Sequence, residues 1–300
     1  MIIRYAESAD NTIVNAFQPS LITRGTGSNA GLADVLETYS IYGRQAISNS
    51  AGPASQELSR ILIQFPITEI SEDRTAGIIP ASGSVSFYLR MFNAPHSKTV
   101  PRDYKLVVQP ISQSWQEGEG LDLEGYKDLT KGNPGSNWMS ASNSAAWTNV
   151  GGDYLTDTAS LMYEQSFSTG IEDLELNITP LVESWMSGTT TNYGVGVHLS
   201  SSFEAFFSSS SGANTGSIIH NPNGAKKSYF TKRFFARGTQ YFFKKPVIEA
   251  RFDDTIRDKR ADFYFSSSLA PAADNLNTLY LYNFIRGKLT NIPSVGTGNI

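Results

Sequence analysis

The fold is decided by residues 174–199, which read LELNITPLVESWMSGTTTNYGVGVHL. The first four residues alternate apolar and polar side chains, which is the period-2 pattern of a half-buried strand. Thr179 suits the N-cap of a helix, Pro180 suits its first turn, and Gly188 suits a left-handed end. The alternation then resumes. The stretch therefore predicts a strand, a short helix with Trp185 on its apolar face, a loop and a second strand.

Segments of similar character lie on both sides of this stretch. They alternate apolar and polar residues or are rich in β-branched and aromatic side chains, both of which favour strands. The segments expected to be strands are 58–65, 83–92, 104–110, 161–167 and, as two strands around Gly238, 228–248. We expect 83–92 and 104–110 to pair through the loop between them. The segment 34–42 fits a strand or a short helix.

These elements predict an all-β fold. We expect a jelly-roll β-sandwich over residues 1–247 and a smaller β segment over 248–300. The second segment has strand-like pieces at 263–265, 279–284 and 288–292, which are compatible with the start of an immunoglobulin-like domain. The side chains expected between the two sheets are Leu62, Phe65, Phe87, Leu89, Val107, Leu176, Trp185 and Val195.

The same stretch resembles a known family. Its residues Asn177, Ile178, Thr179, Leu181, Val182, Trp185, Gly188, Asn192, Tyr193 and Gly194 follow a pattern of the DNRLRE-type domains. Two further blocks agree in order, SRILIQF at 59–65 and WQEG at 115–118. These domains are jelly-roll modules, similar to carbohydrate-binding modules, of extracellular bacterial proteins and phage virion proteins. The resemblance implies a jelly roll in which Trp115 and Trp185 are structural.

Composition limits the classes of function. The chain has 300 residues, a formal net charge of −4 and no cysteine, so disulfides and thiolate chemistry are excluded. No apolar run approaches the roughly 20 residues of a membrane-spanning helix, and the N-terminus lacks the apolar region of a secretory signal. A family found mainly outside cells, on a chain without a visible export signal, predicts a virion protein made in the host cytoplasm.

Two functional hypotheses follow. The first is a non-enzymatic structural protein of a tailed-phage virion, in the capsid decoration, neck or tail, whose partners are other virion proteins or copies of itself. The alternative is a carbohydrate-binding module of a host-recognition or cell-surface protein. We expect no nucleic-acid partner, no membrane contact and no cofactor. The sequence has no nucleophile elbow and no phosphate-binding loop. A third possibility is an enzyme such as a polysaccharide lyase, but we find no catalytic constellation for it in this sequence.

The long loop at 116–153 carries two candidate sites. Its carboxylates could coordinate Ca²⁺, which takes six to eight oxygen ligands, or could simply keep the loop soluble. The candidate calcium ligands are Glu117, Glu119, Asp122 and Glu124. Trp138 and Trp147 are expected either to pin the loop to the body or to contact a glycan.

A basic and aromatic segment lies at 226–251. Bases alternating with aromatic residues could stack nucleic-acid bases, but arginine and aromatic residues are also enriched at protein interfaces. Because the whole chain is acidic, we favour an interface or core role. The residues expected at an assembly contact are Tyr229, Lys232, Arg233, Arg237 and Tyr241.

Overall fold

The chain forms two compact units, Met1–Asp253 and Asp254–Ile300. The computed structural model describes residues 1–20, 22–42, 56–96, 100–121, 135–156, 159–226, 228–255, 269, 271, 273 and 282–292. The first unit extends past residue 247, where the sequence placed the boundary. It does so because β11 (Val247–Arg251) pairs with β1 (Ile2–Ala6) on one side and β5 (Ser86–Met91) on the other.

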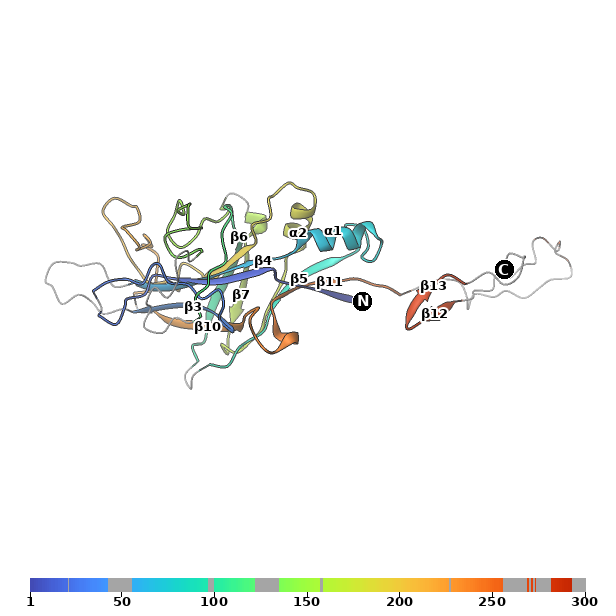
Figure 1. Cartoon of the computed structure of the whole chain (residues 1–300), viewed down its shortest axis with the longest axis horizontal. Helices are drawn as coiled ribbons and strands as arrows, with labels where there is room; N and C mark the ends of the chain where they lie inside the picture. The colour runs from blue at the N-terminus through green and yellow to red at the C-terminus, as the bar shows by residue number, and fades with distance from the viewer. Residues whose placement is uncertain are drawn as a thin grey trace. The chain divides into compact units, whose positions relative to one another are not determined.

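The first unit is an all-β sandwich, as predicted (Figure 1). One sheet has the strand order β1-β11-β5-β8, and we call it the first sheet. The second sheet has the order β10-β3-β4-β9-β6-β7, with β2 also paired to β4, and every pairing in both sheets is antiparallel. The remaining strands are β2 (Ala9–Val14), β3 (Val35–Tyr42), β4 (Gln56–Gln64), β6 (Tyr104–Pro110), β7 (Tyr163–Phe167), β8 (Leu174–Asn177), β9 (Val195–Leu199) and β10 (Tyr229–Phe235).

Strand β4 is buried on both faces. Ile61 and Ile63 point into the core between the sheets, whereas Leu58 and Leu62 belong to a second apolar cluster that also contains Trp115, Trp138 and Trp147. Leu62 therefore does not lie between the sheets, which corrects the sequence prediction. Of the other predicted core residues, Phe65, Phe87, Leu89, Trp185 and Val195 lie in the core between the sheets, and Leu176 is partly buried against it. Val107 is buried, but it points to the opposite face from Leu106 and Val108, which corrects its predicted place between the sheets.

The decisive stretch folds as predicted, except at the start of its helix. Helix α2 (Thr179–Met186) is preceded by Ile178, so Thr179 lies inside the helix. Its hydroxyl instead donates to Asn177 Oδ1 at 2.6 Å and accepts the backbone N–H of Phe87 at 2.8 Å, which fastens the helix to β5. Gly188 has a φ of 74°, as the left-handed end requires.

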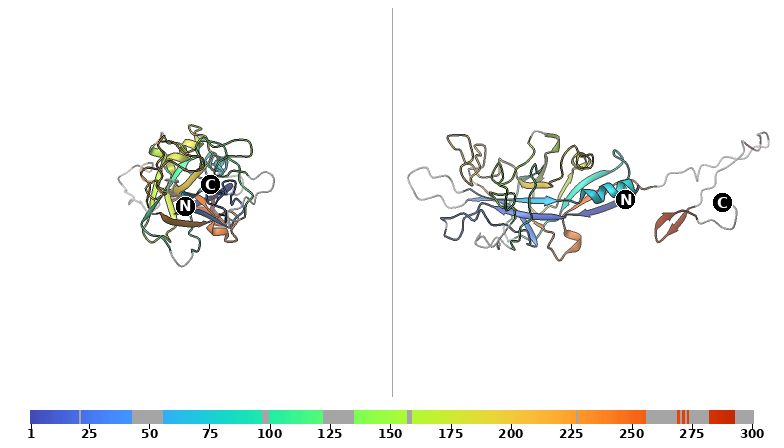
Figure 2. Two further views of the ribbon diagram at one scale, coloured as in Figure 1. Left: turned by 90° about the vertical axis from the view of Figure 1, so that its left-hand side faces the viewer. Right: turned by 45° about the horizontal axis from the view of Figure 1, so that its top comes forward.

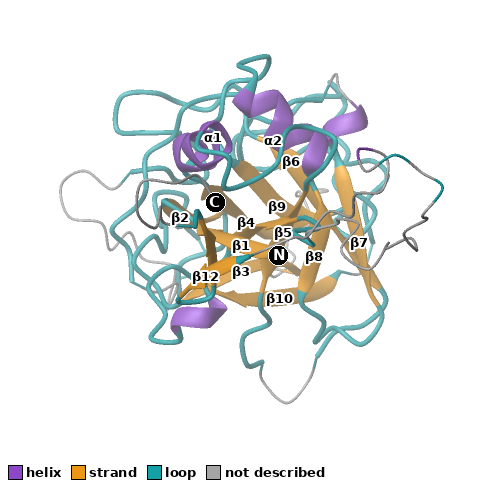
Figure 3. Ribbon diagram, turned by 90° about the vertical axis from the view of Figure 1, so that its right-hand side faces the viewer, coloured by secondary structure: helices purple, strands orange, loops and turns teal. Residues whose placement is uncertain are grey.

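A second helix, α1 (Ile67–Thr75), was not expected from the sequence. It lies beside α2 on one side of the sandwich (Figure 3). The guanidinium of Arg74 donates two hydrogen bonds of 2.7 Å to the carboxylate of Glu183 in α2. Ile67 and Ile70 bury the inner face of α1.

One strand pairing differs from the prediction. β5 and β6 lie in different sheets, so the loop between them crosses from one sheet to the other. The two strands expected around Gly238 are present as β10 and β11, and they lie in different sheets, because β10 pairs with β3 in the second sheet and β11 with β5 in the first. Both connections cross the sandwich, a step that the pattern of a single strand does not encode.

The second unit contains a short hairpin, β12 (Asn283–Ile285) and β13 (Lys288–Thr290). Arg286 and Gly287 have φ values of 52° and 77°, which suit a two-residue turn between antiparallel strands. The pieces expected at 263–265 and 279–281 lie outside the described residues.

Truncation of Trp185 should destabilise the sandwich strongly. Its indole is buried against the core between the sheets, so Trp185→Ala should lower the free energy of unfolding by about 4 kcal/mol. The control Ile78→Ala removes a half-exposed side chain and should cost less than about 0.5 kcal/mol. Urea unfolding of the two variants measures both values. Equal losses would contradict the central place of α2.

Candidate interaction surface

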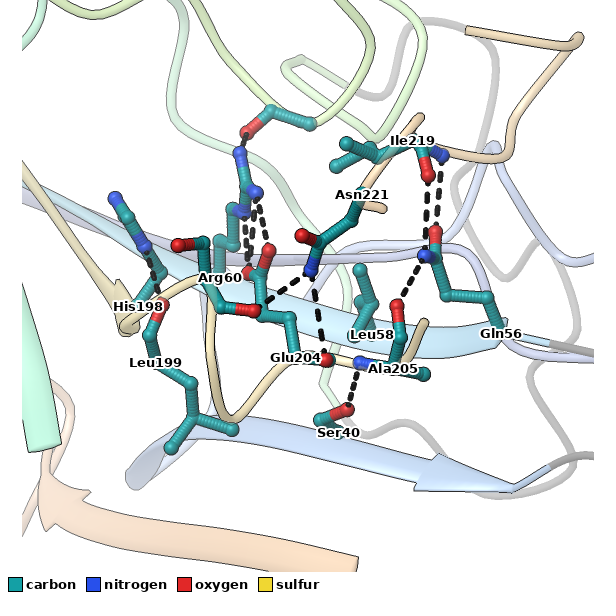
Figure 4. Close-up of polar contacts among 12 residues, drawn as sticks. Ser40, Gln56, Leu58, Arg60, His198, Leu199, Glu204, Ala205, Ile219 and Asn221 are labelled. Carbon is teal, nitrogen blue, oxygen red and sulfur yellow. Dashed lines mark hydrogen bonds and ion pairs between the residues drawn. The ribbon is translucent and has the colours of Figure 1, made fainter. Parts of the chain in front are cut away.

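The outer face of the second sheet is covered by loops that one buried ion pair holds in place (Figure 4). Arg60, on β4, donates to both carboxylate oxygens of Glu204 at 3.0 Å. It also donates to the Gly151 carbonyl at 3.2 Å. Burial alone would lower the pKa of Arg60, and the Glu204 carboxylate more than reverses this effect. One guanidinium thus joins the sheet to the loops at 135–156 and 200–226.

Amide side chains add further bonds to the same loops. Gln56 donates to the carbonyls of Ala205 at 3.0 Å and Ile219 at 3.2 Å, and its oxygen accepts the Ile219 N–H at 2.9 Å (Figure 4). Asn221 donates to the Ser201 carbonyl at 2.7 Å. The loops therefore have defined positions relative to the sheet, although they contain little regular secondary structure.

Trp138 and Trp147 do pin the long loop, as one of the two interpretations expected. Trp138 is 0% exposed and its Nε1 donates to the Ser217 carbonyl at 2.8 Å, while Trp147 donates to the Asn137 carbonyl at 2.8 Å. A sugar stacks on an accessible aromatic face, and these buried indoles offer none. The glycan role predicted for these two residues is therefore corrected.

His198 is a structural residue of this layer. It is buried, and burial together with the charge of Arg60 lowers its pKa to about 4, so the imidazole is neutral at physiological pH. Its Nδ1 donates to the Leu199 carbonyl at 2.8 Å (Figure 4). The imidazole thus belongs to the hydrogen-bond network under the loops.

Removing one partner of the buried ion pair should destabilise the protein more than removing both partners. Arg60→Met leaves the Glu204 carboxylate buried without its cation, and we expect a loss of about 4 kcal/mol in the free energy of unfolding. The double variant Arg60→Met/Glu204→Met should recover at least about 2 kcal/mol of that loss. Urea unfolding measures the values. The exposed pair Lys105–Glu164 is the control, since Lys105→Met should change stability by under about 1 kcal/mol. If the double variant lost as much stability as the single variants Arg60→Met and Glu204→Met lose together, the two residues would not be coupled as proposed.

The candidate calcium ligands are divided by the structure. Glu117 is bound in an ion pair with Arg237, and Glu119 is exposed. Asp122 and Glu124 lie outside the described residues. Within the described part of the chain, no group of three or more acidic or histidine side chains is arranged to hold a metal ion.

The predicted assembly residues also separate. Lys232 is 0% exposed, and its ammonium donates to Asn93 Oδ1 and to the carbonyls of Gly170 and Glu172 at 2.7 to 3.0 Å. Burial lowers its pKa to about 8. Lys232 is therefore an interior cation and no contact residue, which corrects the prediction. Tyr229 and Arg233 lie on the outer face of the same strand, where alternate residues point.

A turn between β10 and β11 exposes several large aromatic side chains. We call Tyr241, Phe242, Phe243, Lys244 and Lys245 the aromatic turn, which includes the short 3₁₀ helix η3 (Phe242–Lys244). Phe242 is 73% exposed and Phe243 77%, and their rings pack edge to face 5.3 Å apart. Figures 2 and 3 show η3 on the side of the sandwich away from α1 and α2. Contiguous exposed aromatic residues of this kind mark interaction sites.

The sequence prediction named Tyr241 as a contact residue and included Phe242 and Phe243 only as part of the wider basic and aromatic segment. Gly238 and Pro246 bracket these residues, and Pro246 prevents a regular strand from continuing through the segment. The positions of this glycine and this proline could have predicted a protruding turn from the sequence.

The base of the aromatic turn is anchored. Arg237 donates to both oxygens of Glu117 at 2.7 and 2.8 Å, and its backbone N–H donates to Asp10 at 2.6 Å. On the other side, the backbone N–H of Glu7 donates to the Pro246 carbonyl at 3.2 Å. The turn therefore projects from a fixed base, which reduces the entropy lost when a partner binds.

Glu7 is an unusual part of this base. It is buried, and neither of its carboxyl oxygens has a hydrogen-bond partner among the described residues. Burial raises the pKa of Glu7 to about 8, and the nearby Asp10, whose own pKa is raised by burial to about 6, adds to the effect. Glu7 is therefore largely protonated at neutral pH.

Glu7→Gln should stabilise the protein in a pH-dependent way. Because the pKa of Glu7 is about 8 in the folded state and 4.5 ordinarily, its stabilising contribution is complete below pH 4.5 and is lost as the pH rises through 8. The amide does not ionise, so the gain in unfolding free energy at about pH 9 should exceed that at about pH 5 by roughly 4 kcal/mol. Thermal and urea unfolding at the two pH values measure it.

The control Ser8→Ala removes a neighbouring group that does not titrate, and its effect should be the same at both pH values. A pH-independent effect of Glu7→Gln would show that Glu7 is ionised in the folded state.

No protein-family model matches the chain, and no match is found among curated proteins. Within the described residues, every helix is too short or too polar to cross a membrane.

Proposed function

We propose that this chain is a non-enzymatic structural protein of a tailed-phage virion, which acts through contacts with other virion proteins or copies of itself. The observation that carries the contact role is the aromatic turn, which combines two exposed phenylalanines with a fixed base. Interfaces derive much of their binding energy from a few large aromatic anchors. Pre-organised anchors of this kind favour tight association.

The charges of the aromatic turn indicate the character of the partner. Lys244 lies over the rings of Phe235 and Tyr241, and Lys245 lies over Phe242, at 5.0 to 5.9 Å. Neither lysine forms an ion pair with an acidic side chain of the described residues. A partner with an apolar pocket and carboxylates at its rim would complement this turn.

The use of two carboxylates as ion-pair partners supports a non-enzymatic role. Glu117 and Glu204 each neutralise an arginine that fixes a loop or turn. The virion assignment rests on the resemblance of three sequence blocks to the DNRLRE-type domains. In two of these blocks, Arg60 and Trp185 have structural roles in the sandwich.

Replacing the two phenylalanines should abolish assembly without unfolding the protein. Phe242→Ser/Phe243→Ser removes two exposed rings, and the loss of aromatic anchors typically costs ~2 kcal/mol or more each in binding. Incorporation into particles, measured by quantitative mass spectrometry, should fall at least about tenfold. The matched control Leu32→Ser/Ile78→Ser removes two other half-exposed side chains and should assemble normally. A wild-type chain missing from particles, or unchanged incorporation of the phenylalanine variant, would refute the proposal.

A further inference from the structure

A buried lysine and an asparagine side chain meet at a point where the two sheets approach each other. Lys232 lies on β10, the edge strand of the second sheet, and Asn93 follows β5 of the first sheet and bridges to Phe234. Lys232 is 0% exposed, and its Nζ lies 2.7 Å from Asn93 Oδ1. The two residues are 139 positions apart in the chain. A primary amine and a carboxamide are thus held together inside the protein.

The amine of Lys232 lies between aromatic rings. Its Nζ is 5.0 Å from the ring centroids of Phe167 and Phe234, both of which are fully buried. Its other acceptors are the backbone carbonyls of Gly170 and Glu172, at 3.0 and 2.7 Å. Carbonyls carry no net charge, and burial lowers the pKa of Lys232 to about 8. A fraction of the lysine is therefore an uncharged amine at neutral pH, and an uncharged amine is a nucleophile.

The carboxamide of Asn93 is oriented for attack. Because an ammonium can only donate, the atom that faces Lys232 is the oxygen. The same oxygen lies 3.0 Å from His96 Nε2, which must therefore donate to it and can stabilise negative charge that forms there. Asn93 is half-buried, and its Nδ2 has no hydrogen-bond partner among the described residues. The nitrogen that must leave during an attack is thus not held in place.

Glu172 supplies a proton acceptor beside this pair. Its Oε1 accepts from the Thr169 N–H at 2.7 Å and the Ser168 hydroxyl at 3.0 Å, whereas its Oε2 is buried without a partner among the described residues. Burial raises the pKa of Glu172, but the hydrogen bonds outweigh this effect and keep the carboxylate ionised at neutral pH. Its charge is the largest that acts on Lys232.

We propose that Lys232 and Asn93 join through an isopeptide bond, which links the two sheets covalently. The lone pair of the uncharged Nζ attacks Asn93 Cγ, and the electron pair of the C=O bond moves onto Oδ1. Glu172 Oε2 takes a proton from the attacking nitrogen and passes it to Nδ2. The C=O bond then re-forms as the bond between Cγ and Nδ2 breaks, and ammonia leaves. The proton that Nζ first lost to solvent is recovered when ammonia becomes ammonium, so no co-reactant is consumed.

The surroundings favour this reaction. Partners held in contact react as if at very high concentration, and the aromatic rings exclude the water that would compete for Cγ. The product also replaces a buried cation with a neutral amide, which removes the cost of burying charge. The bond would constrain the unfolded chain as a disulfide does, in a sequence that has no cysteine. This inference does not depend on the proposed structural role.

Intact mass spectrometry of the denatured full chain tests the proposal. The loss of ammonia should lower the mass by about 17 Da relative to that of the sequence. Because trypsin does not cleave after an amide-linked lysine, digestion should give one branched peptide that joins residues 91–98 to residues 228–233. The variant Asn93→Asp should form the same bond by losing water and should reach the same final mass as the wild type.

Two variants identify the reacting groups. Lys232→Met removes the nucleophile and should keep the full mass of its sequence. Its matched control is Lys105→Met, which removes an exposed lysine and should still lose ammonia. Glu172→Gln keeps an oxygen for Thr169 and Ser168 but removes the proton acceptor, and should slow the loss of mass at least about a hundredfold.

The mass of the wild-type protein decides the question even if Lys232→Met fails to fold. A wild-type chain that keeps the mass of its sequence overturns the inference. So does an ammonia loss that fragmentation places at a succinimide, for example at Asn223–Gly224, because a succinimide forms no branched peptide. A folded Glu172→Gln that reacts as fast as the wild type overturns the role of Glu172. Particle incorporation of the phenylalanine variant is a separate readout, so failure of the cross-link leaves the assembly proposal distinct.

Discussion

The buried pair between Arg60 and Glu204 is the interaction on which the arrangement of the loops depends. A cation on the face of a central strand must be neutralised when water is excluded, and Glu204 provides the only carboxylate bound to Arg60 in the described residues. Through Glu204 and the Gly151 carbonyl, Arg60 holds two long loops against β4. Strand β4 is consequently buried on both faces, one toward the core between the sheets and the other by loops. The outer surface is then formed by segments with fixed positions.

Much of the scaffold could be predicted from the sequence because it depends on local pattern. The alternation at the start of 174–199 and in β5 is a direct result of strand geometry, β4 and β6 are rich in apolar side chains, and Gly188 marks the end of α2 through its backbone conformation. Helix α1 was missed because its apolar periodicity is weak and only Ile67 and Ile70 are buried. The pairing of strands was less accessible, since it depends on whether a connection crosses between the sheets.

The functional surface was harder to predict, because burial depends on which segment covers which. Lys232 resembles its neighbours Arg233 and Tyr229 in sequence, yet it lies on the opposite face of β10 and is bound by carbonyls from a distant loop. From the sequence, Trp138 could stack on a sugar, but in the structure the loop around residue 217 covers it. In contrast, Phe242 and Phe243 are exposed because the chain turns there on its way from one sheet to the other. The exposed surfaces of the sandwich therefore lie where no loop covers the side chains.

We conclude that the loops form a fixed layer on β4, and hydrogen–deuterium exchange of the intact protein checks this claim. The amides of Trp147, Gly151 and Ile219 are hydrogen-bonded within or beneath this layer. They should exchange at least about a hundredfold more slowly than amides of the exposed turn at 81–83, which lies outside these loops, because slow exchange requires stable structure. Exchange of all three amides as fast as in that turn would show that the loops open freely, and would contradict the claim.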